Sequence, residues 1–215
     1  MGIKRESGFT LVEIAIVVAV VGLLIGGVMK GSEMITNARL KRIENDQSQI
    51  AATIMTYQDR YRQLPGDDSL ASQRFSIYTD GKNDPAPIDI NGGGDGYLDG
   101  DWIAAANTET ANVWKHLRAS GLIDGSGDDD SQPKNANGGV IGLRDTSLQL
   151  TGIVTVFGSL EGQVMRILEA RLDDGSPAEG RIQAELTAAQ MNGNVASTAG
   201  AIYLEDTLYF VAFKL

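Results

Sequence analysis

An apolar run over residues 9–29 dominates the hydrophobic pattern of the chain, because its only polar side chains are those of Thr10 and Glu13. A helix of about 20 residues, rising about 1.5 Å per residue, is about 30 Å long, which matches the hydrocarbon core of a bilayer. The run therefore predicts a helix that can span a membrane.

The helical pattern continues after the apolar run. Residues 30–63 contain no proline, and their apolar positions recur at mixed three- and four-residue steps, which places a stripe on one face of a helix. The stripe consists of Ile35, Ile43, Ile50, Ile54, Tyr57 and Tyr61. Pro65 then stops the helix. We expect one helix over about 9–63, its membrane half at 9–29 and its amphipathic half at 30–63, under a globular head domain at 64–215.

The pattern in the head domain changes from helical spacing to short apolar and β-branched runs. Asp67, Asp68 or Ser69 is expected to cap a short helix that ends near Arg74, and Asn107 or Thr108 to cap a second helix that Gly121 ends. A third helix is expected from about Glu161. Strands are expected at 140–143, 148–157, 181–186, 201–205 and 208–213. The fold class is therefore α+β, with an antiparallel sheet against the amphipathic half of the long helix.

The residues before the apolar run form a short leader over 1–8. Lys4 and Arg5 predict a cytoplasmic N-terminus and a translocated C-terminus. A secretory signal is cut after its apolar region, whereas here the small residue Gly8 precedes that region. A cut after Gly8 would leave the apolar helix on the mature protein, with Phe9 as its first residue.

Glu13 is the unusual residue of the apolar run. A carboxylate at membrane depth is costly and is usually paired. A cut after Gly8 would create a partner, the free amine of Phe9. One helix cannot easily fold its own end back onto Glu13, but the Phe9 amine of a neighbouring, staggered chain can reach it. The alternative is an ordinary membrane anchor with a stray glutamate.

Together, the basic leader, Gly8 and the segment Phe9-Thr10-Leu11-Val12-Glu13 resemble the class III signal of type IV pilins and type II secretion pseudopilins. The resemblance implies cleavage between Gly8 and Phe9 by prepilin peptidase, N-methylation of Phe9 and a role for Glu13 in assembly. It also implies a pilin-like fold in which the long helix is the spine.

The resemblance further implies a structural role rather than an enzymatic one. The expected product is a helical filament of identical subunits or of several pilins, built by an inner-membrane assembly platform. The precursor would lie in the bacterial inner membrane with a periplasmic head, and the mature protein in an extracellular pilus or a periplasmic pseudopilus. A pseudopilin of a type II secretion system, or a minor pilin in adhesion or DNA uptake, stays as an alternative. Many type IVa pilins have a kinking proline in the apolar half, and its absence here favours a pseudopilin.

Composition limits the kinds of partner and cross-link that the protein can have. The net charge of −10 argues against general nucleic-acid binding. The chain has no cysteine, so a disulfide cannot hold the long head loops in place. No cofactor is required, although a structural calcium ion is one candidate for that task.

The candidate calcium loop is rich in Asp, Asn and Gly. Calcium takes six to eight oxygen ligands from a flexible loop. Its candidate ligands are Asp89, Asn91, Asp95, Asp99 and Asp101. Counted from Asn91, Trp102 stands where an EF-hand has its bidentate glutamate, so the loop is not an EF-hand. A shorter calcium loop and a simply solvated loop both stay open.

Other polar groups predict no catalysis. The run Asp128-Asp129-Asp130 is more often solvated than metal-binding. His116 is the only histidine and lies two residues from Trp114, so we expect a structural role at the surface or half-buried. The sequence offers no nucleophile with a base beside it and no phosphate loop, which makes an enzyme the least supported class.

Overall fold

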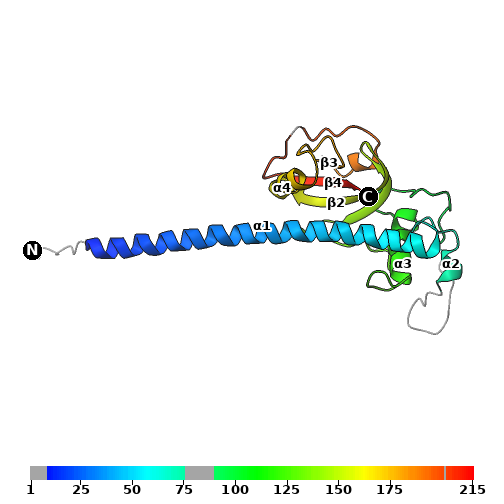
Figure 1. Cartoon of the computed structure of the whole chain (residues 1–215), viewed down its shortest axis with the longest axis horizontal. Coiled ribbons are helices and arrows are strands. Elements are labelled where there is room, and N and C mark those ends of the chain that lie inside the picture. The colour runs from blue at the N-terminus through cyan, green and yellow to red at the C-terminus, as the bar shows by residue number, and fades with distance from the viewer. Residues whose placement is uncertain (1–8, 76–89, 201) are drawn as a thin grey trace, which may run out of the picture. The chain divides into compact units, whose positions relative to one another are not determined.

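The computed structural model describes residues 9–75, 90–200 and 202–215. Its contacts divide the chain into two compact units, Met1–Arg39 and Leu40–Leu215. Helix α1, Leu11–Tyr61, contributes residues to both units (Figure 1). The sequence thus correctly predicts a single long helix at this end of the chain.

In the first unit, α1 exposes its apolar side chains. Phe9, Leu11 and Leu23 are each about four-fifths exposed, at 84%, 86% and 79%. Within the described residues, α1 is the one helix long and apolar enough to cross a membrane, and its most apolar part is not buried. Length and apolarity therefore agree with the expected membrane-spanning segment.

The second unit contains an antiparallel sheet of four strands in the order β1-β2-β4-β3. The strands are β1 (Ile141–Ser147), β2 (Leu150–Glu161), β3 (Ile182–Glu185) and β4 (Leu208–Lys214). Strands β1 and β2 form a hairpin, whereas β4 pairs with both β2 and β3. The sheet lies along the part of α1 that follows Leu40 (Figure 1).

Short helices complete this unit. They are α2 (Ala71–Arg74), α3 (Glu109–Ala119), α4 (Gly162–Leu172) and the 3₁₀ turn η1 (Gln190–Asn192). Thr108 caps α3, as predicted, by accepting a hydrogen bond from the backbone N–H of Ala111. The cap expected for α2 is wrong, because its N-cap residue is Leu70 and no side chain caps it. The Asp67 and Asp68 side chains are used for other contacts, described below.

The core of the second unit joins α1 to the sheet. Leu40, Ile43 and Tyr57 of α1 belong to the same buried cluster as Phe157 of β2 and Phe213 of β4. Burial of each such side chain contributes about 1.5–3 kcal/mol to stability. The Oγ1 of Thr155 also donates a hydrogen bond from β2 to the side-chain oxygen of Gln47 on α1. The predicted α+β architecture is therefore confirmed.

The strand predicted over 201–205 is wrong for its described residues, 202–205, which form no strand. Tyr203 is held through its side chain, its ring packing 5.0 Å from that of Tyr209. The backbone N–H of Leu204 donates to Tyr209 Oη, and a turn from Leu204 to Thr207 leads into β4. An apolar segment is thus anchored by an aromatic contact instead of a strand ladder.

The exit from α1 depends on a glycine. Arg62 takes the left-handed conformation at φ 58°, which ends α1 at Tyr61. Gly66 follows at φ 95°, and a Cβ there would lie 2.6 Å from the carbonyl oxygen of Glu109. Only glycine fits a position with both constraints.

Candidate functional site

The first turn of α1 is closed by a reciprocal pair of hydrogen bonds between Thr10 and Glu13. The backbone N–H of Thr10 donates to Glu13 Oε2 at 2.8 Å, and the backbone N–H of Glu13 donates to Thr10 Oγ1 at 3.3 Å. The Thr10 hydroxyl also donates to Glu13 Oε2 at 2.8 Å. This arrangement is a capping box. Its sequence pattern, Thr-x-x-Glu before an apolar run, is visible in the chain, yet our sequence analysis missed it.

The capping box uses only one oxygen of Glu13. Within the described residues, Glu13 Oε1 accepts no hydrogen bond. The side chain is exposed, so Oε1 remains accessible to a group from another molecule. The predicted partner, a free Phe9 amine, is absent while the Gly8–Phe9 peptide bond is intact, and Gly8 lies outside the described residues. The expected pairing therefore stays a prediction.

The surface around the first part of α1 is open. A Cβ added at Gly22, Gly26 or Gly27 would meet no atom within 4 Å. These glycines are therefore not required by packing within one chain. Large exposed apolar surfaces of this kind mark contacts with a membrane or with other chains.

The candidate calcium loop is organised by two carboxylates that lie outside it. Asp67 is only 1% exposed, and it accepts backbone N–H groups of Asp95 at 3.1 Å and Gly96 at 2.7 Å. Glu109 accepts the backbone N–H of Asp99 at 2.9 Å, and it also binds that of Gly93. These hydrogen bonds hold the loop in place, a task for which calcium was one candidate.

Two of the predicted calcium ligands accept hydrogen bonds from backbone N–H groups. Asn91 Oδ1 accepts the backbone N–H of Ser72 at 2.9 Å, and Asp95 Oδ1 accepts that of Tyr97 at 3.0 Å. Asp99 and Asp101 are exposed, and Asp89 lies outside the described residues. Among the acids of 90–101, no three bring their oxygens within 4.8 Å of one another. Calcium binding here stays a prediction.

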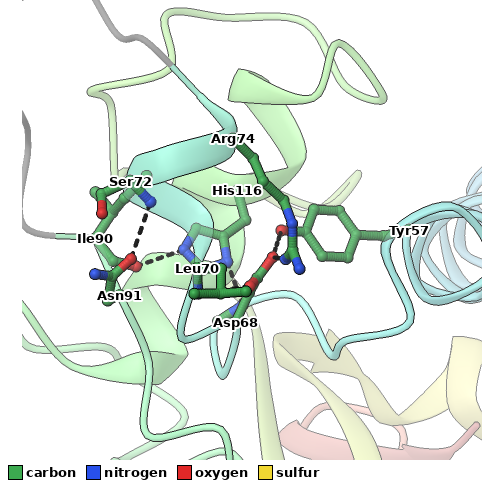
Figure 2. A network of polar contacts seen from close by, with 9 residues as sticks. Tyr57, Asp68, Leu70, Ser72, Arg74, Ile90, Asn91 and His116 are labelled. Carbon is green, nitrogen blue, oxygen red and sulfur yellow. Dashed lines mark hydrogen bonds and ion pairs between the residues drawn. The ribbon is translucent and has the colours of Figure 1, made fainter.

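His116 is fully buried, so the expected surface or half-buried position is wrong, although its role is structural as expected. Its Nδ1 accepts the backbone N–H of Gly66 at 2.8 Å, which places the proton on Nε2, 2.6 Å from the carbonyl oxygen of Ile90. Burial lowers the pKa of His116 and keeps the ring neutral. Figure 2 shows the ring directed at Ile90. The physical reason is that α3 is buried around its whole circumference from Thr110 to Leu117.

A buried aspartate lies beside this histidine. Asp68 Oδ2 accepts a hydrogen bond from Tyr57 Oη at 2.8 Å and forms an ion pair with Arg74, while Asp68 Oδ1 accepts the N–H of Leu70 at 2.9 Å (Figure 2). This network joins α1 to α2. It satisfies a charge that would otherwise be buried alone.

The aspartate run 128–130 pairs with α3. Arg118 lies 3.7 Å from Asp129, and Lys115 lies 3.7 Å from Asp130. Arg118 also donates to the carbonyl oxygens of Asp129 and Ser131. Two charges of the run are thus balanced by the protein itself.

Comparison with known proteins identifies the N-terminal segment. A family model described as the prokaryotic N-terminal methylation motif matches residues 3–29. Comparisons with curated proteins and with solved structures gave no match. The matched residues include the leader from residue 3 onward, Phe9, the capping box and the apolar part of α1. The chain therefore carries the prepilin signal of type IV pilins and pseudopilins.

Proposed function

We propose that this chain is a structural subunit of a type IV pilus-like filament, made as a membrane precursor and cut after Gly8 by prepilin peptidase. The observation that carries the proposal is the methylation motif over residues 3–29 on a helix whose apolar side chains are exposed. N-methylation of Phe9 would follow cleavage and would keep the positive charge of the amine.

Assembly would bury the exposed part of α1 against the same part of neighbouring subunits. Apolar side chains there are free to pack against other helices, and the open surroundings of Gly22, Gly26 and Gly27 permit close approach. The free Oε1 of Glu13 would receive the Phe9 amine of a neighbour, while Oε2 keeps the first turn capped. One carboxylate would then serve both the helix end and the contact between subunits.

The cellular course follows from the same features. The precursor would lie in the bacterial inner membrane with its N-terminus in the cytoplasm and residues 40–215 in the periplasm, as the basic leader predicts. An inner-membrane platform would add subunits to the filament. The final location would be an extracellular pilus.

One observation favours the second candidate, a pseudopilin of a type II secretion system. Helix α1 runs from Leu11 to Tyr61 without a proline. The two candidates share the N-terminal chemistry and differ in the length and location of the filament. Images of sheared surface material distinguish them, because only a pilin gives long surface fibres.

The test of the proposal begins with the mature N-terminus. Mass spectrometry of the native protein should find a chain that starts with N-methylated Phe9. The variant Gly8→Leu should keep its leader, whereas the matched variant Gly2→Leu, at a glycine of the leader away from the cut, should mature normally. A native protein that retains Met1 through Ser7, or a Gly8→Leu chain that still begins at Phe9, would contradict the proposal.

A further inference from the structure

Three acidic side chains gather at the C-terminal end of α4. Glu169, Asp173 and Asp174 each place an oxygen within 4.8 Å of the others. Glu169 is fully buried, Asp173 is half-buried and Asp174 is exposed. The cluster therefore extends from the interior of the head domain to solvent, which gives a small ligand a route of entry.

Glu169 is the side chain that needs an explanation. Both of its carboxylate oxygens are buried and have no hydrogen-bond partner among residues 9–75, 90–200 and 202–215. The hydroxyl of Tyr203 is also buried and unpartnered within the same residues. Buried polar groups are nearly always paired, and an unpaired carboxylate is among the most costly exceptions. A bound ligand that contacts this carboxylate would remove the cost.

The neighbouring basic residues do not fill this role. Arg166 pairs with Glu205 at 2.8 Å, and Arg171 lies 3.8 Å from Glu44. Across the described part of the chain, no lysine or arginine forms an ion pair with any of the three clustered acids. The charge of the cluster is therefore not balanced by the protein.

The two aspartates are oriented by the backbone. Asp173 Oδ2 accepts the N–H of Ile182 at 2.8 Å and that of Arg181, and Asp174 Oδ1 accepts the N–H of Ser176 at 2.8 Å. Each aspartate keeps its second oxygen free of these hydrogen bonds. The contacts fix both carboxylates and link the end of α4 to the start of β3.

We propose that Glu169, Asp173 and Asp174 form a binding site for a divalent, oxygen-preferring cation of the calcium class. Ligands at about 2.4 Å from one calcium ion lie at most about 4.8 Å apart, which is the separation of these oxygens. A cluster of carboxylates without cysteine or histidine suits such an ion better than zinc. The Tyr203 hydroxyl and water would supply further oxygens.

The test uses the full-length chain in detergent micelles, stripped with EDTA and titrated with CaCl₂ by calorimetry. We expect one ion to bind at this cluster and the melting temperature to rise. Glu169→Gln and Asp174→Asn should each weaken binding at least about tenfold. The control Asp99→Asn, in the loop at 90–101, should bind like the wild type.

Three outcomes would overturn the proposal. They are the absence of heat and melting shift in the wild type, unchanged binding by both Glu169→Gln and Asp174→Asn, and loss of binding in Asp99→Asn alone. The apo form of Glu169→Gln removes an unpaired buried acid and should fold. Because Asp174 is exposed, Asp174→Asn tests cation binding at the cluster even if Glu169→Gln misfolds.

Discussion

Gly66 donates its backbone N–H to His116 Nδ1, 2.8 Å away and 50 positions later in the chain. The other ring nitrogen lies 2.6 Å from the carbonyl oxygen of Ile90, and the ring stacks on that of Tyr57 with 6.0 Å between the centroids. One neutral imidazole therefore joins the exit of α1, residue 90 and α3. No disulfide can join these three segments, since the chain contains no cysteine.

The first prediction concerns the pH dependence of this junction. Burial lowers the pKa of His116 in the folded state. The unfolded chain therefore binds a proton near pH 6.5 while the folded chain does not. The stability that wild type has over His116→Gln should be greatest above about pH 6.5, about 2–4 kcal/mol, and should shrink as the pH falls toward the folded pKa.

Thermal unfolding of both proteins in micelles between pH 5 and 8, followed by tryptophan fluorescence, measures this difference. His116 is the single histidine, so the comparison isolates one imidazole. A difference that stays constant over the whole range would show that the ring is not buried in its neutral form.

The second prediction concerns Asp67. Its carboxylate accepts the backbone N–H groups of Gly94, Asp95 and Gly96. Asp67→Ala should lower the free energy of unfolding by about 3 kcal/mol or more, because hydrogen bonds to charged groups are worth about 1.5–3 kcal/mol each and are not additive. Hydrogen exchange at these three amides should accelerate more than exchange in β2. The exposed Asp95 provides the control, since Asp95→Ala should change stability by less than about 1 kcal/mol. Equal protection of the three amides in wild type and Asp67→Ala would refute the assignment.

The third prediction separates the two roles of Glu13. Glutamine can replace glutamate in a capping box but carries no charge. Glu13→Gln should therefore keep the first turn of α1 and normal processing, yet assemble at least about tenfold less filament, as a lost ion pair in an apolar setting implies. Glu13→Ala should lose the cap as well. Glu33→Gln, at an exposed glutamate paired with Lys30, should assemble normally. Normal filaments from Glu13→Gln would mean that its charge has no part in assembly.

The fourth prediction concerns Glu169 in the absence of cations. Its folded pKa of about 8 lies above the ordinary value of 4.5, so the folded chain holds a proton that the unfolded chain releases. The stability of wild type relative to Glu169→Gln should be greatest below about pH 4.5 and should decline by up to about 1.4 kcal/mol per pH unit as the pH rises toward 8. Chemical denaturation in EDTA at several pH values measures this decline. A parallel pH course for the two proteins would mean that Glu169 is ionised in the fold.

Local sequence patterns were enough to predict the long helix, the helices that begin near Thr108 and Glu161, and the strands on either side of β4. Each of these depends on periodicity or on a cap within a few residues. The strand predicted over 201–205 is wrong because the ring of Tyr203 is buried by packing against the ring of Tyr209 and not by pairing in a sheet. No local pattern distinguishes such an anchor from a strand.

The polar contacts likewise fall into those between residues close in sequence and those that depend on the tertiary fold. The Thr10–Glu13 pair was missed, yet it could have been predicted, because its two residues are three positions apart. Asp67 reaches Gly96 across 29 positions, and this contact depends on the tertiary fold. His116 was placed near the surface by assuming that α3 has one buried face, whereas every residue from Thr110 to Leu117 is buried. How many sides of a helix are buried depends on the elements that pack around it, and the sequence of the helix alone does not predict this.

The position of β4 between β2 and β3 has a consequence for biosynthesis. A ribosome releases β1 and β2 first, and their hairpin can form at once from adjacent residues. β3 emerges next, but its only partner in the described sheet is β4, which follows more than 20 residues later. During this interval β3 presents unsatisfied backbone groups to the crowded compartment around it. The newly made subunit is therefore most exposed to chaperones and proteases just before its sheet is completed.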